Sequence, residues 1–266
     1  MVESRSHSLR RISGTNTSAM LNLRARANFT IGKRNLSYRQ HYRAKCTVTA
    51  EKPILYGDVA APPVRFVAMT ASILGVELEH RTIDLFASEN RTESYRRINP
   101  LQKVPALVSG ADNICDSHVI SLYLCRKWDH FNVLYPKDAL AKAKVDEMLF
   151  FNSSTLFPID SEIFTRFFSG TKAGESKCNE WTKALDFLEN RLHYHTWLAG
   201  DRMFLCDICA ASTITSVLCL IPLADHHVRL KKWLIEIEKQ PFFDINKKGI
   251  ERLMKFVEIA KKQIVS

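Results

Sequence analysis

The sequence predicts a small α/β domain followed by an all-helical domain. In residues 51–130, short strand-like apolar runs alternate with helical ones, in the order strand, helix, strand, helix, strand, strand, helix. In residues 137–266 only helical periodicity remains. A chain of 266 residues is long enough for two modest domains. Strands joined through helices imply a four-stranded sheet with both parallel and antiparallel pairs.

The first elements are marked by proline, glycine and alternation. Residues 53–56 predict a strand. Pro62 and Pro63 predict a helix start, because proline is tolerated in a first turn, and Gly75 predicts its end. Residues 80–85 alternate like a second strand.

The next stretch predicts a ligand-binding edge. After a short polar helix over residues 93–98, an apolar strand over 106–108 begins directly behind Pro105, and a loop over 109–113 returns the chain. Asp116-Ser117 then opens a helix that runs to residue 127. The strand and the helix start are expected to lie close together.

Both features suit a small anionic peptide. A proline before an edge strand leaves the N–H and C=O of Val104 free to pair with an extended ligand. Ser117, at a helix start, can present its hydroxyl and an orphan N–H to a carboxylate. Taken alone, Ser117 is better explained as a plain helix cap, and it is the Val104-Pro105 strand start before it that favours the ligand interpretation.

The second half reads as helices only. A proline at position 158 is expected to kink or break the first of them. The stretch from 208 to 220 is apolar nearly all round, which predicts a helix at the domain centre. The predicted helices cover residues 139–157, the region around 181–192, and residues 208–220, 228–238 and 250–263.

Charge separates the first fifty residues from the rest. The net charge is +10, but residues 1–50 hold ten Lys or Arg against one acidic residue, whereas residues 51–266 hold 28 basic and 27 acidic residues. The folded part is therefore not a nucleic-acid binder by its charge. The Arg- and Ser-rich extension predicts disorder, an upstream stretch translated only in some transcripts, or a mitochondrial targeting segment; the cytoplasm is the expected location otherwise.

Cysteine and histidine patterns predict no metal site. The seven cysteines have no framework spacing, which favours a reduced compartment, and no apolar run is long enough for a membrane span. Cys206 and Cys209 form a CxxC without a second pair, so they read as buried helix residues. His226 and His227, like His193 and His195, have no Cys or carboxylate set around them in the sequence.

These features resemble the cytosolic glutathione transferases over about residues 52–262. The motifs are Pro62-Pro63-Val64-Arg65, Asn99-Pro100 before Val104-Pro105, and Asp116-Ser117-His118, a form similar to the insect epsilon class. Two further stretches, Lys52-Pro53-Ile54-Leu55-Tyr56 together with the Pro62-Pro63-Val64-Arg65 motif, and Leu149-Phe150 through Leu156-Phe157-Pro158-Ile159-Asp160-Ser161, resemble an epsilon-class transferase required for ecdysteroid production. The resemblance implies a thioredoxin-like α/β domain, an all-α domain, glutathione as co-substrate, and a homodimer.

The resemblance assigns glutathione to the predicted edge. Val104 would pair with the cysteinyl backbone, and Asp116 with the ammonium. Ser117 would take the γ-glutamyl carboxylate, and Gln102 or Lys103 the glycyl carboxylate. The glutathione-binding residues expected on this basis are Asn90, Gln102, Lys103, Val104, Pro105, Asp116, Ser117 and His118.

The expected catalytic hydroxyl is absent. A glutathione transferase stabilises the thiolate with a hydroxyl donor, which delta and epsilon enzymes place just before the Pro-Pro pair. This chain has Ala61 there, so no catalytic residue is assigned. Tyr56 is a weak substitute that is better explained as a packed aromatic.

A second, apolar site is expected around the helical domain. Its residues are Leu85, Phe86, Phe157, Asp160, Ser161 and Phe164. In the ecdysteroid-linked relative the position matching Asp160 contacts a steroid hydroxyl; the alternative is that Asp160 caps a helix restarting after Pro158. Asp207 resembles half of the family's capping box, because Phe204 replaces the usual Ser or Thr.

Three functions follow from this pattern. The first is a glutathione transferase that binds a steroid or sterol and supports ecdysteroid production. The second is a glutathione-bound carrier or sensor with little turnover, which Ala61 favours. The third and weakest is a protein-interaction adaptor on the same fold.

Overall fold

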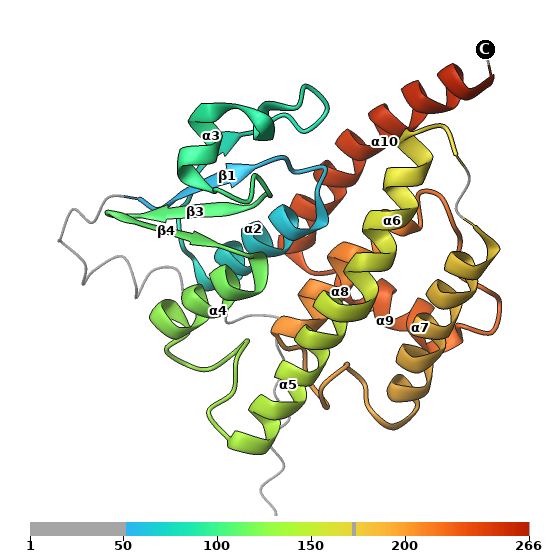
Figure 1. Ribbon diagram of the computed structural model, residues 1–266. Helices are drawn as coiled ribbons and strands as arrows, with labels where there is room; N and C mark the ends of the chain where they lie inside the picture. Colours follow the sequence, from blue (N-terminus) through green and yellow to red (C-terminus); the bar gives the residue numbers. More distant parts are fainter. Residues whose placement is uncertain (1–51, 172–173, 266) are drawn as a thin grey trace, which may run out of the picture. The chain divides into compact units, whose positions relative to one another are not determined.

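The computed structural model describes residues 52–171 and 174–265, and begins with a four-stranded mixed sheet (Figure 1). Its order is β2-β1-β3-β4, made of β1 (Ile54–Gly57), β2 (Glu79–Thr82), β3 (Ala106–Ser109) and β4 (Asp112–Cys115). β1 is parallel to β2 and antiparallel to β3, which is antiparallel to β4. The predicted mixed sheet is confirmed.

Helices cover the sheet. α2 (Pro62–Leu74) and α4 (Ser117–Trp128) pack together on one face, and α3 (Glu93–Ile98) lies on the other side (Figure 1). Leu55 of β1 and Leu107 of β3 bury their side chains against α2 and α4. Gly75 ends α2 with a φ of 69°, in the left-handed region that glycine enters without steric cost.

The second strand is shorter than its alternation predicted. It ends at Thr82, because Asp84 turns the chain instead of extending it. The carboxylate of Asp84 accepts hydrogen bonds from the amides of Phe86 (2.9 Å) and Ala87 (3.0 Å). Such a local turn competes successfully with strand pairing.

The remaining elements are helical. A five-residue π-helical turn, Asn152–Leu156, joins α5 (Ala139–Phe151) to α6 (Phe157–Phe168), so the helix predicted to end at residue 157 continues beyond Pro158. Proline is accommodated in the first turn of α6. The other helices are α7 (Glu175–Tyr194), α8 (Leu205–Val217), α9 (Val228–Glu238) and α10 (Asp244–Val265).

α8 lies at the centre of the helical domain, as its apolar sequence predicted. Every one of its residues is buried. Asp207 in its first turn accepts hydrogen bonds from the amides of Leu198 (2.9 Å) and Phe204 (2.8 Å) and from the Trp233 indole (2.9 Å). Burial nevertheless raises the pKa of Asp207 to about 6. Asp207 therefore stabilises the fold, and Phe204 supplies only its backbone to the cap.

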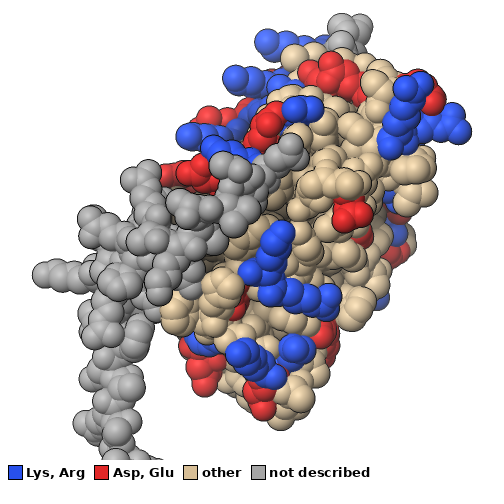
Figure 2. Space-filling model, turned by 90° about the vertical axis from the view of Figure 1, so that its left-hand side faces the viewer, with Lys and Arg blue, Asp and Glu red and all other residues tan. Residues whose placement is uncertain are grey.

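Charges are mixed over the described surface. On the face drawn in Figure 2, basic and acidic side chains are interspersed around a broad uncharged area. Among the described residues, no helix is both long and apolar enough to cross a membrane. The basic extension over residues 1–50, with the targeting alternative attached to it, lies outside the described residues.

α10 approaches α2 very closely. Gly249 of α10 faces Arg65 of α2, and a Cβ at this position would collide with the Arg65 side chain and the carbonyl oxygen of Val59. Only glycine fits this contact without displacing backbone. The contact joins the last helix to the first across the two domains.

Candidate functional site

The loop before β3 is held by its carbonyl groups. The Asn90 amide donates to the carbonyl of Gln102 (2.9 Å), and the Tyr95 hydroxyl (2.8 Å) and Asn99 amide (2.6 Å) donate to that of Lys103. The peptide bond between Val104 and Pro105 is cis. The printed bonds of this loop go to the carbonyls of Gln102 and Lys103, and pairing of the Val104 main chain with a ligand stays a prediction.

Asp116, and not Ser117, caps α4. One carboxylate oxygen of Asp116 accepts hydrogen bonds from the amides of His118 (2.8 Å) and Val119 (3.2 Å), and the side chain is 59% exposed. The helix-cap explanation for Ser117 is therefore wrong. The hydrogen bond from the His118 side chain holds the pKa of Asp116 below its usual range. The Asp116 side chain is thus exposed, whereas Ser117 is buried, with 6% of its surface exposed.

His118 points into the protein. Its ring packs edge-on against Phe66, with ring centroids 5.8 Å apart, and its Nε2 lies 3.4 Å from the Cys209 sulfur. Burial opposes the charged imidazolium, but Cys209 and Asp116 favour it, so the pKa of His118 is raised. This side chain joins α4 to α8, and the His118 amide already donates to Asp116, so a role of His118 in binding glutathione stays a prediction.

The start of α2 offers no donor to a thiolate. Ala61 is the N-cap residue and makes no side-chain hydrogen bond. Pro62 and Pro63 have no N–H, and the amides of Val64 (3.1 Å) and Arg65 (3.3 Å) both donate to the carbonyl of Ala61. A sulfur placed here would therefore find neither a hydroxyl nor a free amide in this turn.

Tyr56 lies on the sheet beside Arg81. Its hydroxyl accepts a hydrogen bond from the Arg81 guanidinium (2.8 Å), which also lies over its ring. Arg81 in turn pairs with Glu79 on the exposed strand β2. These contacts explain Tyr56 as part of the sheet surface.

Aromatic rings from both domains meet beside the α6 helix. Phe86 stacks on Phe256 of α10, with centroids 3.3 Å apart and planes 7° apart, and contacts Phe168 edge-on at 5.4 Å. Phe168 is also stacked 5.9 Å from Phe164. Of the predicted apolar residues, Phe86 and Phe164 are thus brought together. Half-buried Phe157, exposed Ser161 and half-buried Leu85 make no ring contact in this group.

Asp160 is buried, and one of its oxygens has no hydrogen-bond partner among residues 52–171 and 174–265. It lies in the first turn of α6 and is 3% exposed, yet it forms no helix cap, and its Oδ1 atom has no partner among the described residues. The capping alternative is therefore wrong. Burial raises the pKa of Asp160 to about 8, and the charge of Arg65 opposes this rise only in part.

Arg65 cannot supply the missing hydrogen bond. It is fully buried, and its Nε donates to Asn246 (2.8 Å). One terminal nitrogen donates to the carbonyls of Val59 and Ala60. The other donates to the carbonyl of Ser212 and to the hydroxyl of Ser216. A guanidinium has five N–H donors, so all are occupied.

A second buried carboxylate was missed by sequence reasoning. Asp58 is fully buried and accepts two hydrogen bonds from Arg252 of α10 (2.6 and 2.9 Å) and one from the amide of Ala60 (2.9 Å). Arg252 also pairs with Asp84 at 3.3 Å. The sequence held no signal for a pair of residues this far apart along the chain.

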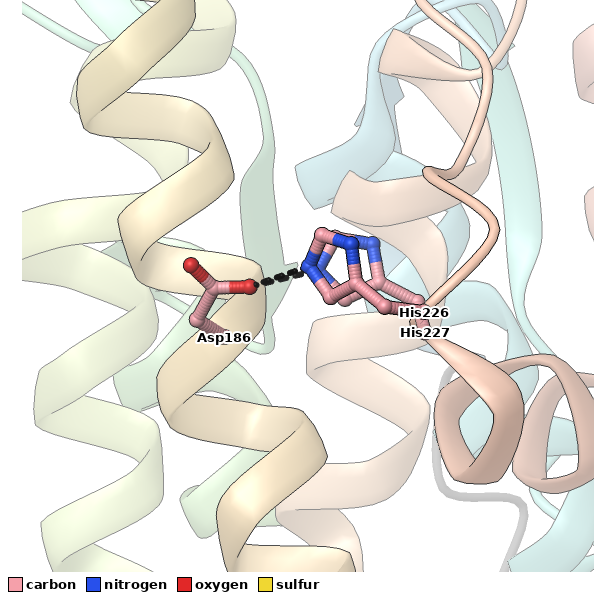
Figure 3. Close-up of side chains that lie close together, drawn as sticks. All are labelled: Asp186, His226 and His227. Atoms are coloured by element: carbon pink, nitrogen blue, oxygen red, sulfur yellow. Dashed lines mark hydrogen bonds and ion pairs between the residues drawn. The ribbon is translucent and has the colours of Figure 1, made fainter.

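Asp186, His226 and His227 lie together between α7 and the start of α9 (Figure 3). The Nε2 atoms of His226 and His227 lie 2.7 and 2.9 Å from one oxygen of Asp186. The expectation that no carboxylate lies near these histidines was therefore wrong.

This cluster is better explained as a hydrogen-bonded clamp than as a metal centre. A metal on Nε2 would place the ring proton on Nδ1, and ligating histidines normally donate that proton to an acceptor. The Nδ1 atom of His227 is buried and has no partner among the described residues. That no metal is bound stays a prediction.

Comparison with known proteins decides the family. Residues 55–130 match the family model "Glutathione S-transferase, N-terminal domain", and residues 158–241 match "Glutathione S-transferase, C-terminal domain". Glutathione S-transferase 1 of Manduca sexta is 32% identical over 199 residues, covering 73% of this chain and 90% of that protein. The chain belongs to the glutathione S-transferase family. It is thus a transferase, and glutathione is the co-substrate of its family.

Solved structures of insect transferases have the same fold. A glutathione transferase homologue from Drosophila mojavensis, with bound glutathione, is 32% identical with a TM-score of 0.75, over 79% of this chain and 97% of that one. An epsilon-class enzyme from Musca domestica is 30% identical with a TM-score of 0.75, over 79% of this chain and 98% of that one. The predicted transferase fold, a thioredoxin-like domain followed by a helical domain, is confirmed.

Proposed function

We propose that this glutathione S-transferase is of the epsilon class and binds a steroid or sterol beside glutathione, in the manner of Noppera-bo, the transferase required for ecdysteroid production. The observation that carries the proposal is Asp160, a buried carboxyl group whose Oδ1 atom has no hydrogen-bond partner in the described part of the chain. A buried polar group is costly unless something satisfies it. A ligand hydroxyl would do so.

The glutathione half of the proposal rests on the edge of β3 and the start of α4. The main chain of Val104 pairs with the cysteinyl unit, and the free oxygen of Asp116 takes the ammonium. Ser117 takes the γ-glutamyl carboxylate at the helix start, with Gln102 or Lys103 near the glycyl carboxylate. The glutathione bound to the Drosophila mojavensis homologue supports this assignment.

The steroid half rests on Asp160 and on an apolar cluster that includes two later residues of the same helix. Phe164 and Phe167 of α6, with Leu220 and Met254, are half-buried and pack around buried Ala60. Apolar walls with a single polar group are typical of sites for hydrophobic ligands. A hydrogen bond to the carboxyl group is worth about 1.5–3 kcal/mol.

Calorimetric titration of the full chain tests the proposal. Asp160→Ala is expected to weaken binding of an ecdysteroid-precursor sterol by roughly 10- to 150-fold, the equivalent of that hydrogen bond, while glutathione binding changes little. Thr165→Ala, an exposed change on the same helix, is the control. An equal loss of both ligands in Asp160→Ala would mean that Asp160 only supports the fold.

The alternative function is a glutathione-dependent carrier or sensor with little turnover. The start of α2, with Ala61 and two prolines, supports it, because a weakly activated thiol reacts slowly at neutral pH. Turnover of chlorodinitrobenzene with glutathione, compared with that of Ala61→Ser, separates the two. A gain of roughly 10-fold or more would identify the missing hydroxyl, and fast turnover without it would exclude the carrier.

The assembly and location remain proposals. Exposed apolar side chains on α4 and α5, among them Val119 and Phe150, support a homodimer. Sedimentation of the full chain tests this, and Phe150→Glu is expected to shift the chain toward monomer. A cytoplasmic location is proposed from the family alone.

A further inference from the structure

We propose that Cys206 and Cys209 of α8 are a redox-active pair, which hydrogen peroxide converts into a disulfide after His118 has activated Cys209. The transferase chemistry described above uses neither thiol, so the inference does not depend on the proposed function. It gives a chemical role to the CxxC motif of this chain, and it names small hydroperoxides as the reagents that modify it.

Three side chains make a continuous line of contacts from the protein surface to the core. One carboxylate oxygen of exposed Asp116 lies 3.5 Å from Nδ1 of His118. The other ring nitrogen of His118, Nε2, lies 3.4 Å from the sulfur of Cys209. A histidine that is oriented by a carboxylate and reaches a thiol is the arrangement that turns cysteine into a nucleophile. The geometry therefore selects Cys209 as the thiol that reacts first.

The charge of His118 favours the reactive form of Cys209. Burial lowers the pKa of His118, but the charges and hydrogen bonds of Cys209 and Asp116 outweigh burial and raise this pKa to about 10. His118 therefore carries both ring protons at neutral pH. An imidazolium at this distance stabilises a thiolate, and the thiolate is the form of cysteine that attacks peroxides.

Cys206 provides the second sulfur of the pair. It lies three positions before Cys209, in the first turn of α8, so helix geometry sets the two Cα atoms about 5 Å apart, within the range that a disulfide spans. Burial raises the pKa of the Cys206 thiol well above its ordinary value, so this thiol does not react with peroxide on its own. Its S–H group donates to a carboxylate oxygen of Asp207 (3.9 Å), which can accept the proton when the disulfide forms.

The reaction balances with hydrogen peroxide as the only oxidant. The Cys209 thiolate attacks one peroxide oxygen, the O–O bond breaks, and the departing hydroxide takes a proton from His118 and leaves as water. Cys209 is then a sulfenic acid. The sulfur of Cys206 bonds to that of Cys209, and the sulfenic O–H group leaves with the Cys206 proton as a second water. Both sulfurs are thereby oxidised, and both peroxide oxygens are reduced.

Burial limits the reagents that reach the pair. Cys206 is fully buried and Cys209 is 2% exposed, whereas the His118 side chain is 17% exposed. The approach to Cys209 therefore runs past His118. It suits hydrogen peroxide, which is close to water in size, better than bulky alkylating reagents.

Differential labelling of the reduced full chain tests the inference. The protein is treated with a small excess of hydrogen peroxide, unfolded in iodoacetamide to block every free thiol, then reduced and labelled with N-ethylmaleimide. Mass spectrometry is expected to find maleimide on both Cys206 and Cys209. Cys219, a half-buried thiol that donates to the carbonyl of Thr215 (3.6 Å), is expected to be blocked by iodoacetamide. Free thiols at Cys206 and Cys209 under conditions that oxidise Cys219 would overturn the inference.

Two serine variants assign the order of the steps. Cys206→Ser is expected to stop at the sulfenic acid of Cys209, which dimedone traps, and Cys209→Ser is expected to leave Cys206 reduced. Dimedone on Cys206 in the Cys209→Ser protein would reverse the two roles and contradict the assignment. The wild-type labelling result stands even where one of these variants does not fold.

The part played by His118 is tested by the rate of oxidation. His118→Gln removes the imidazolium and is expected to slow disulfide formation by roughly 10-fold or more, and His193→Gln, at an exposed histidine of α7, is the control. Asp116→Asn keeps a residue that caps helices but removes the carboxylate charge, so it should slow the reaction by a smaller factor. A wild-type rate in both His118→Gln and Asp116→Asn would remove His118 from the mechanism.

Discussion

The carboxyl groups at the starts of α2 and α6 are buried to the same degree but bonded very differently. Asp58 is 0% exposed and accepts from Arg252 and from the amides of Ala60 and Leu85. Asp160 is 3% exposed and has an oxygen with no partner in the described part of the chain. The difference shows that burial alone does not define a functional carboxyl group. The fold supplies hydrogen bonds to both oxygens of Asp58, whereas it supplies none to the Oδ1 atom of Asp160 from the described residues.

Removing the fully hydrogen-bonded carboxylate of Asp58 should have the largest effect on stability. Asp58→Ala leaves Arg252 with Asp84 alone and two amides without an acceptor, so we expect the free energy of unfolding to fall by about 3 kcal/mol. Urea unfolding measures this. Asp84→Ala, which removes the more exposed partner of the same arginine, should cost about 1 kcal/mol or less. Equal losses would erase the distinction between the two partners.

Replacing Asp160, which has an oxygen without a hydrogen-bond partner among the described residues, by asparagine should instead stabilise the protein, and the gain should grow as the pH rises. The folded pKa of Asp160, about 8, lies above the unfolded one, so the folded state binds more protons and stability falls with rising pH between them. Asp160→Asn does not titrate. Its advantage should grow by up to ~1.4 kcal/mol per pH unit between about pH 5 and 7.

Urea unfolding of both proteins across this pH range checks the sign. Asp58→Asn serves as the opposite case. It replaces a fully hydrogen-bonded carboxylate, so the folded protein should be destabilised. A constant difference between wild type and Asp160→Asn would mean that Asp160 is ionised in the folded protein.

Asp207 offers a test with a smaller expected effect, because two buried tryptophans differ in whether their indole nitrogen has a hydrogen-bond partner among the described residues. Trp233 donates to Asp207 (2.9 Å), whereas the Trp181 indole nitrogen has no partner among the described residues. Trp233→Phe should therefore cost about 1 kcal/mol more unfolding free energy than Trp181→Phe. Chemical unfolding of the two variants measures the difference, and a value near zero would remove the Asp207 bond from the account.

The clamp around half-buried Asp186 should have the smallest effect. The hydrogen bond from His226 lowers the pKa of Asp186, so its contribution to stability is present above the unfolded pKa and is lost as the pH falls through the folded value. Because the Asp186 side chain is 42% exposed, we expect Asp186→Asn to cost only ~0.5 kcal/mol at neutral pH. Unfolding at neutral and acidic pH measures this. Asp201→Asn is the exposed control, and a loss above 2 kcal/mol would contradict a surface role.

Local signals in the sequence predicted most of the fold. The helices Glu93–Ile98 and Val228–Glu238 were predicted at their observed bounds, because periodicity and turn residues act over a few positions. The strand after residue 80 was predicted too long, because alternation cannot reveal that Asp84 turns the chain. The π-helical turn before Pro158 was missed, because it adds no distinctive residue type.

Long-range contacts set the limit for the candidate site. The sequence placed Asp160 and Ala61 correctly in their elements, but could not show that Asp160 lacks a partner. That depends on Arg65, whose donors are taken by residues as distant as Asn246. Arg65 was visible only as the last residue of the Pro-Pro-Val-Arg motif, with no role attached. The resemblance to a family supplied the glutathione assignment, and the geometry supplied the unpaired carboxyl group.

The glycine contact between α2 and α10 bears on how this chain can be modified. Gly249 leaves no room for a side chain beside Arg65, so α2 and α10 are in close contact at this position. Any larger residue there would push the two helices apart and displace Arg65, whose charge acts on Asp160. A library aimed at new ligands should therefore keep position 249 fixed and vary the aromatic group of Phe86, Phe164 and Phe168.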